Sequence, residues 1–392
     1  MRLGIGIAPS QSRSLCIQKR LFTTRCLVAA PQQVKIGKRW KEYQGCNNWE
    51  GLLDPLDENL RGEILRYGKF VDATYNAFDF DPSSPSYATC LHSKQSLLQS
   101  RCGYRVIKNL HATSGIQLPR WTESLPSWMT NRSSWIGYVA VCQDEEEIER
   151  LGRRDVVIAF RGTATCLEWL ENLRATLTQF PGATCQYDSK PMVESGFLSL
   201  YISHTVKFRS LQDQVREEIG KIVKSYGNEP ISITITGHSL GAALATLTAY
   251  DITRSFNHSP LVTVISFGGP RVGNRCFRSQ VEKCGSKILR IVNSSDLITK
   301  LPGFVINEDV EKNEDIHVAG VGLPKWLQKP ADNTQWVYVD VGRELQLSTG
   351  NSPSFVGLIN HNVATCHDLN TYLQLVKLHV SVQGSSNEEK KM

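Results

Sequence analysis

The second half of the chain alternates between short apolar strands and helical segments. Three β-branched runs, at residues 231–236, 262–267 and 288–292, are separated by helical patterns that begin at Leu240 and surround Val281. Strands joined by helical connections pair in parallel through right-handed crossovers. This order predicts an α/β fold whose mainly parallel sheet carries helices on both faces.

Further elements are expected on either side of this alternating region. Residues 135–141 and 156–160 are apolar runs separated by an acidic hinge at 144–147, which predicts a hairpin or meander. Apolar residues at helical spacing predict amphipathic helices over 60–71 and 211–223, and a final helix is expected near Asp368. Residues 336–341 and 344–348 predict an antiparallel edge of the sheet.

Positive charge is concentrated at the beginning of the chain. Residues 1–41 contain nine basic side chains, and the first acidic residue is Glu42. Removing those nine from the 44 basic residues leaves 35 against 38 acidic residues, so the remainder carries a net charge of −3. Such a body is not suited to binding nucleic acid. An acid-free start with arginines, serines and threonines and no long apolar run is typical of an organelle transit peptide.

These patterns divide the chain into four parts. Residues 1–41 are expected to be a disordered transit peptide, 42–130 a helical and loop extension packed on the core, 131–380 the α/β domain, and 381–392 a disordered tail. The longest apolar stretches have five residues, whereas a membrane-spanning helix needs ~20, so no transmembrane segment is expected. The eleven cysteines and the histidines show no zinc spacing, and no metal is expected.

Residues 237–241 read Gly-His-Ser-Leu-Gly, a G-x-S-x-G sequence between a predicted strand and a helix rich in small residues. Such a turn holds its central serine in a strained backbone conformation, so the positions two before and two after it must lack side chains. Gly237 and Gly241 meet this need. The sequence predicts a nucleophile elbow formed by Gly237, His238 and Gly241 around Ser239. A plain turn with an N-capping serine is the alternative.

A serine nucleophile needs an adjacent base that is itself oriented by an acid. Asp296 follows the strand at 288–292, at the carboxyl end where open parallel sheets place their sites. Its rivals are Asp251, inside the helix after the elbow, and Asp340, inside an edge-like strand. The position of Asp296 favours it as the acid.

The base is expected late in the chain, because α/β-hydrolases order their triad Ser, Asp, His. His367 precedes the last predicted helix and satisfies this order. His361 is the main competitor, while His258 precedes the acid and His317 lies in a polar loop. We therefore favour His367.

The tetrahedral intermediate of acyl transfer requires hydrogen-bond donors for its oxyanion. One expected donor is the backbone N–H of Leu240, directly after the nucleophile, and the other comes from the loop after an early strand. The strand at 156–160 continues into Phe-Arg-Gly-Thr, so Thr163 is the second expected donor, through its N–H and its hydroxyl. An ordinary Gly-Thr turn is the alternative.

The segment after Thr163 has apolar residues at helical spacing, interleaved with charges. An amphipathic helix of this kind can pack on the core or form a mobile lid beside the oxyanion loop. A lid could cover the site in water and meet lipid at an interface. The lid candidates are Leu167, Trp169, Leu170 and Leu173, and the same stripe extends to Leu177.

Four motifs in this order resemble the class-3 lipases. They are Phe-Arg-Gly-Thr at 160–163, Gly-His-Ser-Leu-Gly at 237–241, Phe-Gly-Gly-Pro-Arg-Val-Gly-Asn at 267–274, and Val-Asn-Ser-Ser-Asp at 292–296, the last followed by Leu301-Pro302. Residues 40–75, with Trp-Glu-Gly-Leu-Leu-Asp-Pro-Leu, are similar to the plant plastid-targeted phospholipase A1 branch of that family. The resemblance extends over residues 40–380.

The resemblance implies an α/β-hydrolase fold with Ser239, Asp296 and His367 as catalytic triad, Thr163 and Leu240 as oxyanion donors, and no cofactor. It implies an enzyme that hydrolyses sn-1 acyl esters of glycerolipids at a membrane or lipid-droplet surface, as a peripheral protein. The chloroplast is the favoured location, and the mitochondrion is the less favoured one. A lipase-like signalling or lipid-binding protein without catalysis is the alternative. The hypothesis of a nucleotide-binding protein has less support, because residues 268–273 lack the Lys-Ser/Thr of a phosphate loop.

Overall fold

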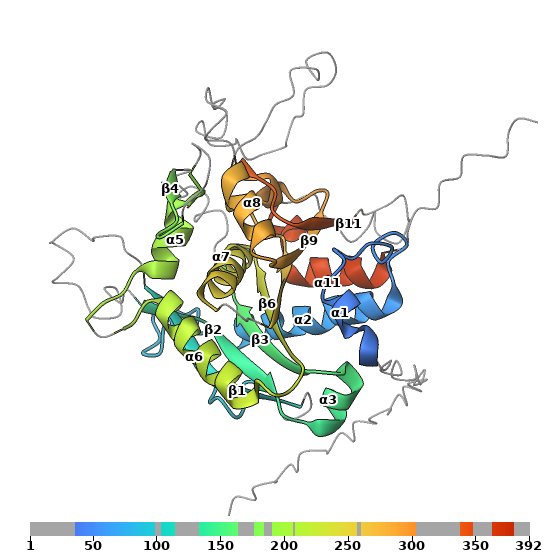
Figure 1. The fold of residues 1–392 in the computed structure, drawn as a ribbon. Helices are drawn as coiled ribbons and strands as arrows, with labels where there is room; N and C mark the ends of the chain where they lie inside the picture. The colour runs from blue at the N-terminus through green and yellow to red at the C-terminus, as the bar shows by residue number, and fades with distance from the viewer. Residues whose placement is uncertain are drawn as a thin grey trace, which may run out of the picture. The chain divides into compact units, whose positions relative to one another are not determined.

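A mixed sheet organises the described part of the chain, with seven strands in the order β1-β2-β3-β6-β7-β9-β11 (Figure 1). The computed structural model describes residues 36–98, 103–113, 133–163, 176–183, 190–206, 208–256, 260–302, 338–347 and 363–379, all within the unit 35–392. The strands are β1 (Tyr104–Thr113), β2 (Ser133–Cys142), β3 (Arg154–Phe160), β6 (Ile231–His238), β7 (Leu261–Phe267), β9 (Lys287–Asn293) and β11 (Arg343–Leu347).

The pairing of these strands confirms the predicted mainly parallel sheet. From β3 to β11 every neighbouring pair is parallel. β2 pairs antiparallel with β3, as the hairpin or meander prediction requires, and β1 extends this antiparallel edge. No strand was expected in residues 42–130, so the sequence analysis did not predict β1.

The prediction that residues 336–341 and 344–348 form an antiparallel edge was wrong. β11 pairs parallel with β9, while β10 (Tyr338–Val339) joins a second, antiparallel sheet of four strands in the described residues. Gly342, with φ of +98°, turns the chain between β10 and β11, so the two strands enter different sheets. The other strands of the second sheet are β4 (Leu177–Gln179), β5 (Met192–Glu194) and β8 (Gly273–Asn274).

Helices cover both faces of the large sheet (Figure 1). One face carries α5 (Ser195–Ile202), α6 (Leu211–Tyr226), α7 (Leu240–Ser255) and α8 (Arg275–Lys283). The other carries α1 (Trp40–Tyr43), α2 (Glu58–Asn76) and α11 (Leu369–Leu378). Shorter helical pieces are η1 (Gly37–Arg39), α3 (Glu145–Leu151), η3 (Leu297–Lys300) and α10 (Val363–Cys366).

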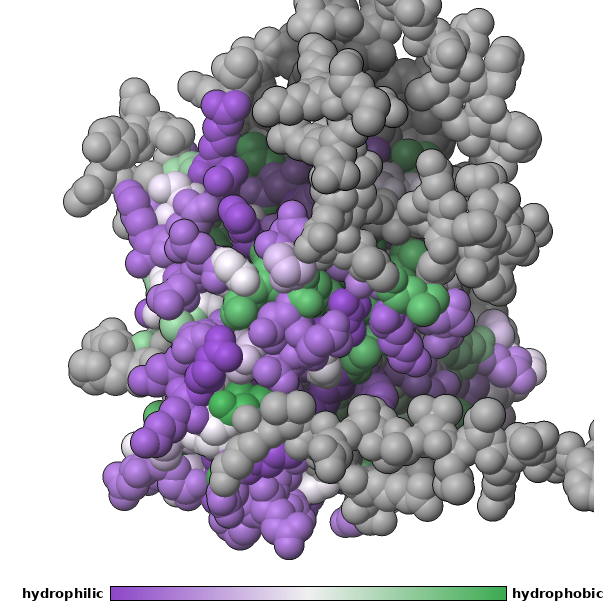
Figure 2. All heavy atoms as spheres, turned by 90° about the vertical axis from the view of Figure 1, so that its right-hand side faces the viewer, coloured by the Kyte–Doolittle hydropathy of each residue, from purple (hydrophilic) through white to green (hydrophobic). Residues whose placement is uncertain are grey.

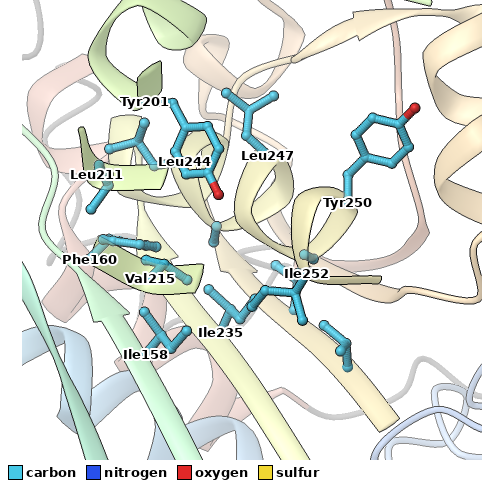
Figure 3. Packing of buried hydrophobic residues seen from close by; sticks show 14 of the residues in the cluster. Ile158, Phe160, Tyr201, Leu211, Val215, Ile235, Leu244, Leu247, Tyr250 and Ile252 are labelled. Carbon is cyan, nitrogen blue, oxygen red and sulfur yellow. The ribbon is translucent and has the colours of Figure 1, made fainter. Parts of the chain in front are cut away.

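Alternation along the strands builds two hydrophobic cores. On β3, Val156, Ile158 and Phe160 face the cluster under α5, α6 and α7, while Val157 and Ala159 face the cluster under α2 and α11. Figure 3 shows the first cluster, in which side chains of α6 and α7 pack onto the strands. Because β3 and β6 are covered on both faces, their carboxyl ends are held firmly where the candidate site lies.

Local signals decided several helix boundaries. The predicted helix over 211–223 is confirmed as α6, which is capped by Ser210 and is followed by Gly227 as its C-cap. The expected acidic hinge is instead α3, because Asp144 caps its first turn and Gly152 ends it with φ of +71°. Leu177, expected on a helix, lies in β4.

A buried group of charged side chains fastens α2 to the amino ends of β3 and β6. Arg66 contacts Glu63 at 2.6 Å and Asp155 at 3.1 Å, and Arg153 donates to Ser232 at 2.6 Å. Burial alone would raise the pKa of the Asp155 carboxyl, but the charges of Arg153 and Arg66 outweigh it and hold that pKa below its ordinary value.

Replacing Asp155 by alanine is expected to lower the free energy of unfolding by about 3–5 kcal/mol, because both arginines lose a buried counter-charge. A carboxylate with a depressed pKa stabilises the fold above its ordinary pKa of about 4, and this contribution is lost as the pH falls through the lower, folded value. Chemical denaturation at pH 7 and at pH 3 tests both statements. The exposed pair of Glu217 and Lys221 provides the control, since Glu217→Ala should leave the midpoint nearly unchanged. An equal effect of the two changes would contradict the assignment.

The visible surface agrees with inward-facing apolar side chains. Figure 2 shows the face to the right in Figure 1, where polar residues dominate and apolar ones form small separate groups. Among the described helices, none combines the length and apolarity that crossing a membrane requires.

Candidate active site

Ser239 occupies the turn between β6 and α7. Its backbone has φ of 57° and ψ of −124°, a combination that non-glycine residues rarely adopt, and only 2% of the residue is exposed. The Ser239 N–H donates to the Phe267 carbonyl at 3.0 Å, which ties the turn to the end of β7. The strain at Ser239 is thus maintained by the surrounding sheet.

The two glycines of the turn are required by close backbone contacts. A side chain at Gly237 would place its Cβ 2.3 Å from the carbonyl carbon of Gly241. A side chain at Gly241 would place its Cβ 2.6 Å from the Phe160 carbonyl oxygen. No larger residue fits at either position, and the first turn of α7 therefore packs directly on the end of β3.

Asp296 and His367 form a buried hydrogen-bonded pair. His367 Nδ1 lies 2.7 Å from Asp296 Oδ2, and both residues are almost fully buried. Asp296 directly precedes η3 and its other oxygen accepts from the Ile298 N–H, which fixes the carboxylate plane. A carboxylate on Nδ1 keeps the proton on that nitrogen and leaves Nε2 as the basic atom.

Two contacts hold the His367 backbone against the strand ends. Asn293, the last residue of β9, donates through Nδ2 to the Cys366 carbonyl at 2.8 Å. His238 Nε2 lies 2.6 Å from the His367 carbonyl, and the two imidazole rings are 4.7 Å apart between centroids. Because His238 directly precedes Ser239, these contacts bring the elbow, the acid and the base to the carboxyl edge of the sheet.

Tyr372 of α11 is a second partner of the acid that the sequence analysis did not identify. Its hydroxyl donates to Asp296 Oδ2 at 2.6 Å and accepts from the Asn293 N–H at 3.2 Å. Burial, and then the Asp296 charge, raise the pKa of Tyr372 well above its ordinary value, so the phenol stays a donor. The only sequence signal is its place in the helix that directly follows His367.

The predicted oxyanion loop lies beside the elbow. A Cβ on Gly162 would stand 3.2 Å from Ser239 Cβ, and Arg161 donates to the Gly162 carbonyl at 2.8 Å and to the Trp135 carbonyl at 2.9 Å. Thr163 Oγ1 is buried with no hydrogen-bond partner among the described residues. Leu240 begins α7, where the first backbone N–H groups lack helical acceptors.

A second tyrosine missed by the sequence analysis reaches the oxyanion loop from α2. Tyr75 Oη accepts from the Gly162 N–H at 2.9 Å and lies 2.7 Å from His238 Nδ1. No local pattern marks Tyr75, because it stands far from both partners in sequence. The amino-terminal segment therefore contributes directly to the site.

The rival acids have other partners. Asp251 is buried in α7, where it accepts from Gln212 and from Arg216, and Asp340 contacts Arg271 and Arg290 at 3.1 Å each. Neither approaches an imidazole among the described residues. Several candidates lie outside the described residues, namely His258, His317, His361, Leu167, Trp169, Leu170 and Leu173.

Comparison with known proteins shows the family of this chain. Residues 157–306 match the family described as Lipase (class 3). The chain is 61% identical over 357 residues to phospholipase A(1) DAD1, chloroplastic, of Arabidopsis thaliana, covering 89% of this chain and 78% of that protein. The chain belongs to the class 3 lipase family. The class 3 match contains Thr163, Ser239 and Asp296, while His367 and Tyr75 lie outside it.

Other similar proteins share less of the sequence. Phospholipase A1 EG1, chloroplastic/mitochondrial, of Oryza sativa subsp. indica is 41% identical over 86% of this chain and 74% of its own length. Galactolipase DONGLE, chloroplastic, of Arabidopsis thaliana is also 41% identical, over 87% of this chain and 70% of its own length. The solved structure of nonglycosylated Yarrowia lipolytica LIP2 lipase is 21% identical, covering 63% of this chain and 76% of that one, with a TM-score of 0.42.

Proposed function

We propose that this class 3 lipase is a serine acyl-ester hydrolase that releases a fatty acid from the sn-1 position of membrane glycerolipids. The observation that carries the proposal is the buried contact of 2.7 Å between His367 Nδ1 and Asp296 Oδ2, placed next to the strained turn of Ser239. A nucleophile, a base and an orienting acid are the groups that acyl transfer requires.

The reaction proceeds through an acyl-enzyme. His367 takes the proton of Ser239 as its Oγ attacks the ester carbonyl, and the oxyanion accepts hydrogen bonds from the amides of Leu240 and Thr163. The bond to the leaving alkoxide breaks while His367 returns the proton to it, which frees the lysolipid. Water, deprotonated by the same imidazole, then releases the fatty acid and restores Ser239.

Asp296 and Tyr372 prepare the base for this cycle. The carboxylate holds the Nδ1–H of His367 and stabilises the imidazolium that forms in each step. The hydroxyl of Tyr372 satisfies the same carboxylate oxygen, which limits the ways in which Asp296 can turn. No step uses a metal or an organic cofactor.

The substrate class and location follow from the relatives. The three plant relatives named above are two phospholipases A1 and a galactolipase, and each of their names carries the word chloroplastic. For this chain we assign phosphatidylcholine and galactolipids as the first substrates to test, triacylglycerol as a further one, and the chloroplast as location. The acid-free basic start of the chain supports a transit peptide over residues 1–41.

Action at a membrane or lipid-droplet surface is supported by exposed apolar side chains near the site edge. Phe80 and Leu91 are exposed in the segment that follows α2, whose end contacts the oxyanion loop through Tyr75. Phe208 is also exposed, and its ring stacks on His111 near the end of β1. We assign peripheral contact with lipid to the surface that carries these exposed side chains.

Lipid hydrolysis by the full chain tests this function. Phosphatidylcholine, monogalactosyldiacylglycerol and triolein, each with distinguishable sn-1 and sn-2 acyl chains where applicable, are incubated with the protein, and the released fatty acid is identified. We expect sn-1 release from at least one of the two membrane lipids. Absence of any release, together with no labelling by a fluorophosphonate probe, would favour the alternative of a lipase-like signalling or lipid-binding protein.

A further inference from the structure

A chain of hydrogen bonds joins α2, the elbow and the backbone of the base. It runs from the Gly162 N–H to Tyr75 Oη at 2.9 Å, from Tyr75 Oη to His238 Nδ1 at 2.7 Å, and from His238 Nε2 to the His367 carbonyl at 2.6 Å. His238 and the amide of Gly162 thus share one tyrosine hydroxyl. The mechanism above assigns a role to none of these three groups.

The chemistry of the end groups fixes the direction of every bond. A carbonyl oxygen can only accept, so His238 Nε2 must carry the proton that it donates to His367. Burial, and then the neighbouring His367, hold the pKa of His238 well below its ordinary value, so the ring is neutral and its Nδ1 is an acceptor. Tyr75 must therefore donate its O–H to Nδ1, while its oxygen accepts from Gly162.

We propose that Tyr75 and His238 are positioning residues for acyl transfer, which set the oxyanion loop and the His367 backbone relative to each other. The inference rests on the proposed function. Gly162 directly precedes Thr163, the expected oxyanion donor, and His367 is the expected base. The hydrogen bonds through Tyr75 and His238, here called the relay, therefore set the position of the oxyanion loop relative to His367. Both must act on the same ester group of the substrate.

Close packing makes this position sensitive to the relay. A Cβ on Gly162 would lie 2.3 Å from Tyr75 Oη and 2.9 Å from the His238 carbonyl, so the loop, the tyrosine and the elbow are already in contact. The contacts of the relay lie between four separate chain segments. Displacing an oxyanion donor by about 1 Å can cost about 10²-fold in rate, whereas substrate affinity depends mainly on other surfaces.

Tyr75→Phe tests the relay because it removes the hydroxyl and keeps the ring. On a soluble p-nitrophenyl ester we expect kcat to fall about 10- to 10²-fold with KM changed less than about twofold. Tyr138→Phe is the matched control. Tyr138 also donates a buried hydroxyl to α2, at the Phe70 carbonyl and 2.8 Å, and its loss should leave kcat within about twofold of wild type.

His238→Gln provides an independent variant. Its amide can still donate to the His367 carbonyl, but it offers no acceptor at the place of Nδ1, so it breaks the same link as Tyr75→Phe. The double variant should therefore lose little more kcat than the more damaging single variant, because both changes remove one interaction. If the two changes caused independent structural defects, the fold losses of kcat would instead multiply in the double variant.

The outcomes separate this inference from the proposed function. A wild-type protein without ester hydrolysis would overturn the function and the relay with it. If the wild type is active and folded Tyr75→Phe keeps kcat within twofold, or loses no more than Tyr138→Phe, the relay is wrong while the function stands. Thermal unfolding establishes folding, and His238→Gln decides the test should Tyr75→Phe not fold.

Discussion

Ser239→Ala is expected to give a folded protein that hydrolyses acyl esters on the order of 10⁶-fold more slowly than wild type, as in other serine hydrolases that lose their nucleophile. The change removes only the Oγ that attacks the ester. Oxyanion donors and substrate binding remain, so a small rate above that of water can persist. Steady-state hydrolysis of a p-nitrophenyl ester and of phosphatidylcholine measures the loss.

The strained turn supplies a check on stability. Ser239 has φ of 57°, which alanine must also adopt, so the fold should not gain stability from the change. An unfolding midpoint close to wild type together with lost activity would support a purely chemical role. Retention of more than about one hundredth of the wild-type rate by a pure preparation would exclude Ser239 as nucleophile.

Asp296→Asn should reduce kcat/KM by about 10⁴-fold, as a comparable change does in other triads. The amide of asparagine can donate to Nδ1, which stabilises the tautomer with its proton on Nε2, where the base must accept. The charge that stabilises the imidazolium is lost as well. Because the Ile298 N–H can still donate to the remaining side-chain oxygen, the position of the side chain should persist.

Asp340→Asn is the matched control for this prediction. Asp340 was a rival acid in the sequence, and its carboxylate instead contacts Arg271 and Arg290. We expect its replacement to change kcat/KM by less than about threefold, since its carboxylate is partly exposed and pairs with arginines rather than with a catalytic group. Equal losses in the two variants would remove the reason to assign the acid to Asp296.

The sequence predicted those parts of the site that local chemistry determines. Gly237 and Gly241 mark the elbow because no Cβ fits there, and Asp296 follows a strand whose carboxyl end must face the same edge as Ser239. Alternating strands and helices predicted parallel pairing for the same reason. Each of these features depends on residues close together in the chain.

Features that depend on distant contacts could not be predicted in this way. Tyr75 meets Gly162 and His238 only because α2 packs across the sheet, and Tyr372 meets Asp296 only after α11 docks on the same face. Likewise, the residues of β10 and β11 read as one edge, and the turn at Gly342 that separates their sheets shows only in the folded backbone.

Mapping the residue that reacts with a fluorophosphonate probe tests the central claim most directly. The full chain is labelled, and the adduct is located by intact mass and peptide mass spectrometry in the wild type and in His367→Ala. We predict a single adduct on Ser239 whose rate of formation falls by orders of magnitude when His367 is removed. An adduct on any other residue of the active protein, or undiminished labelling of Ser239 without His367, would contradict the account.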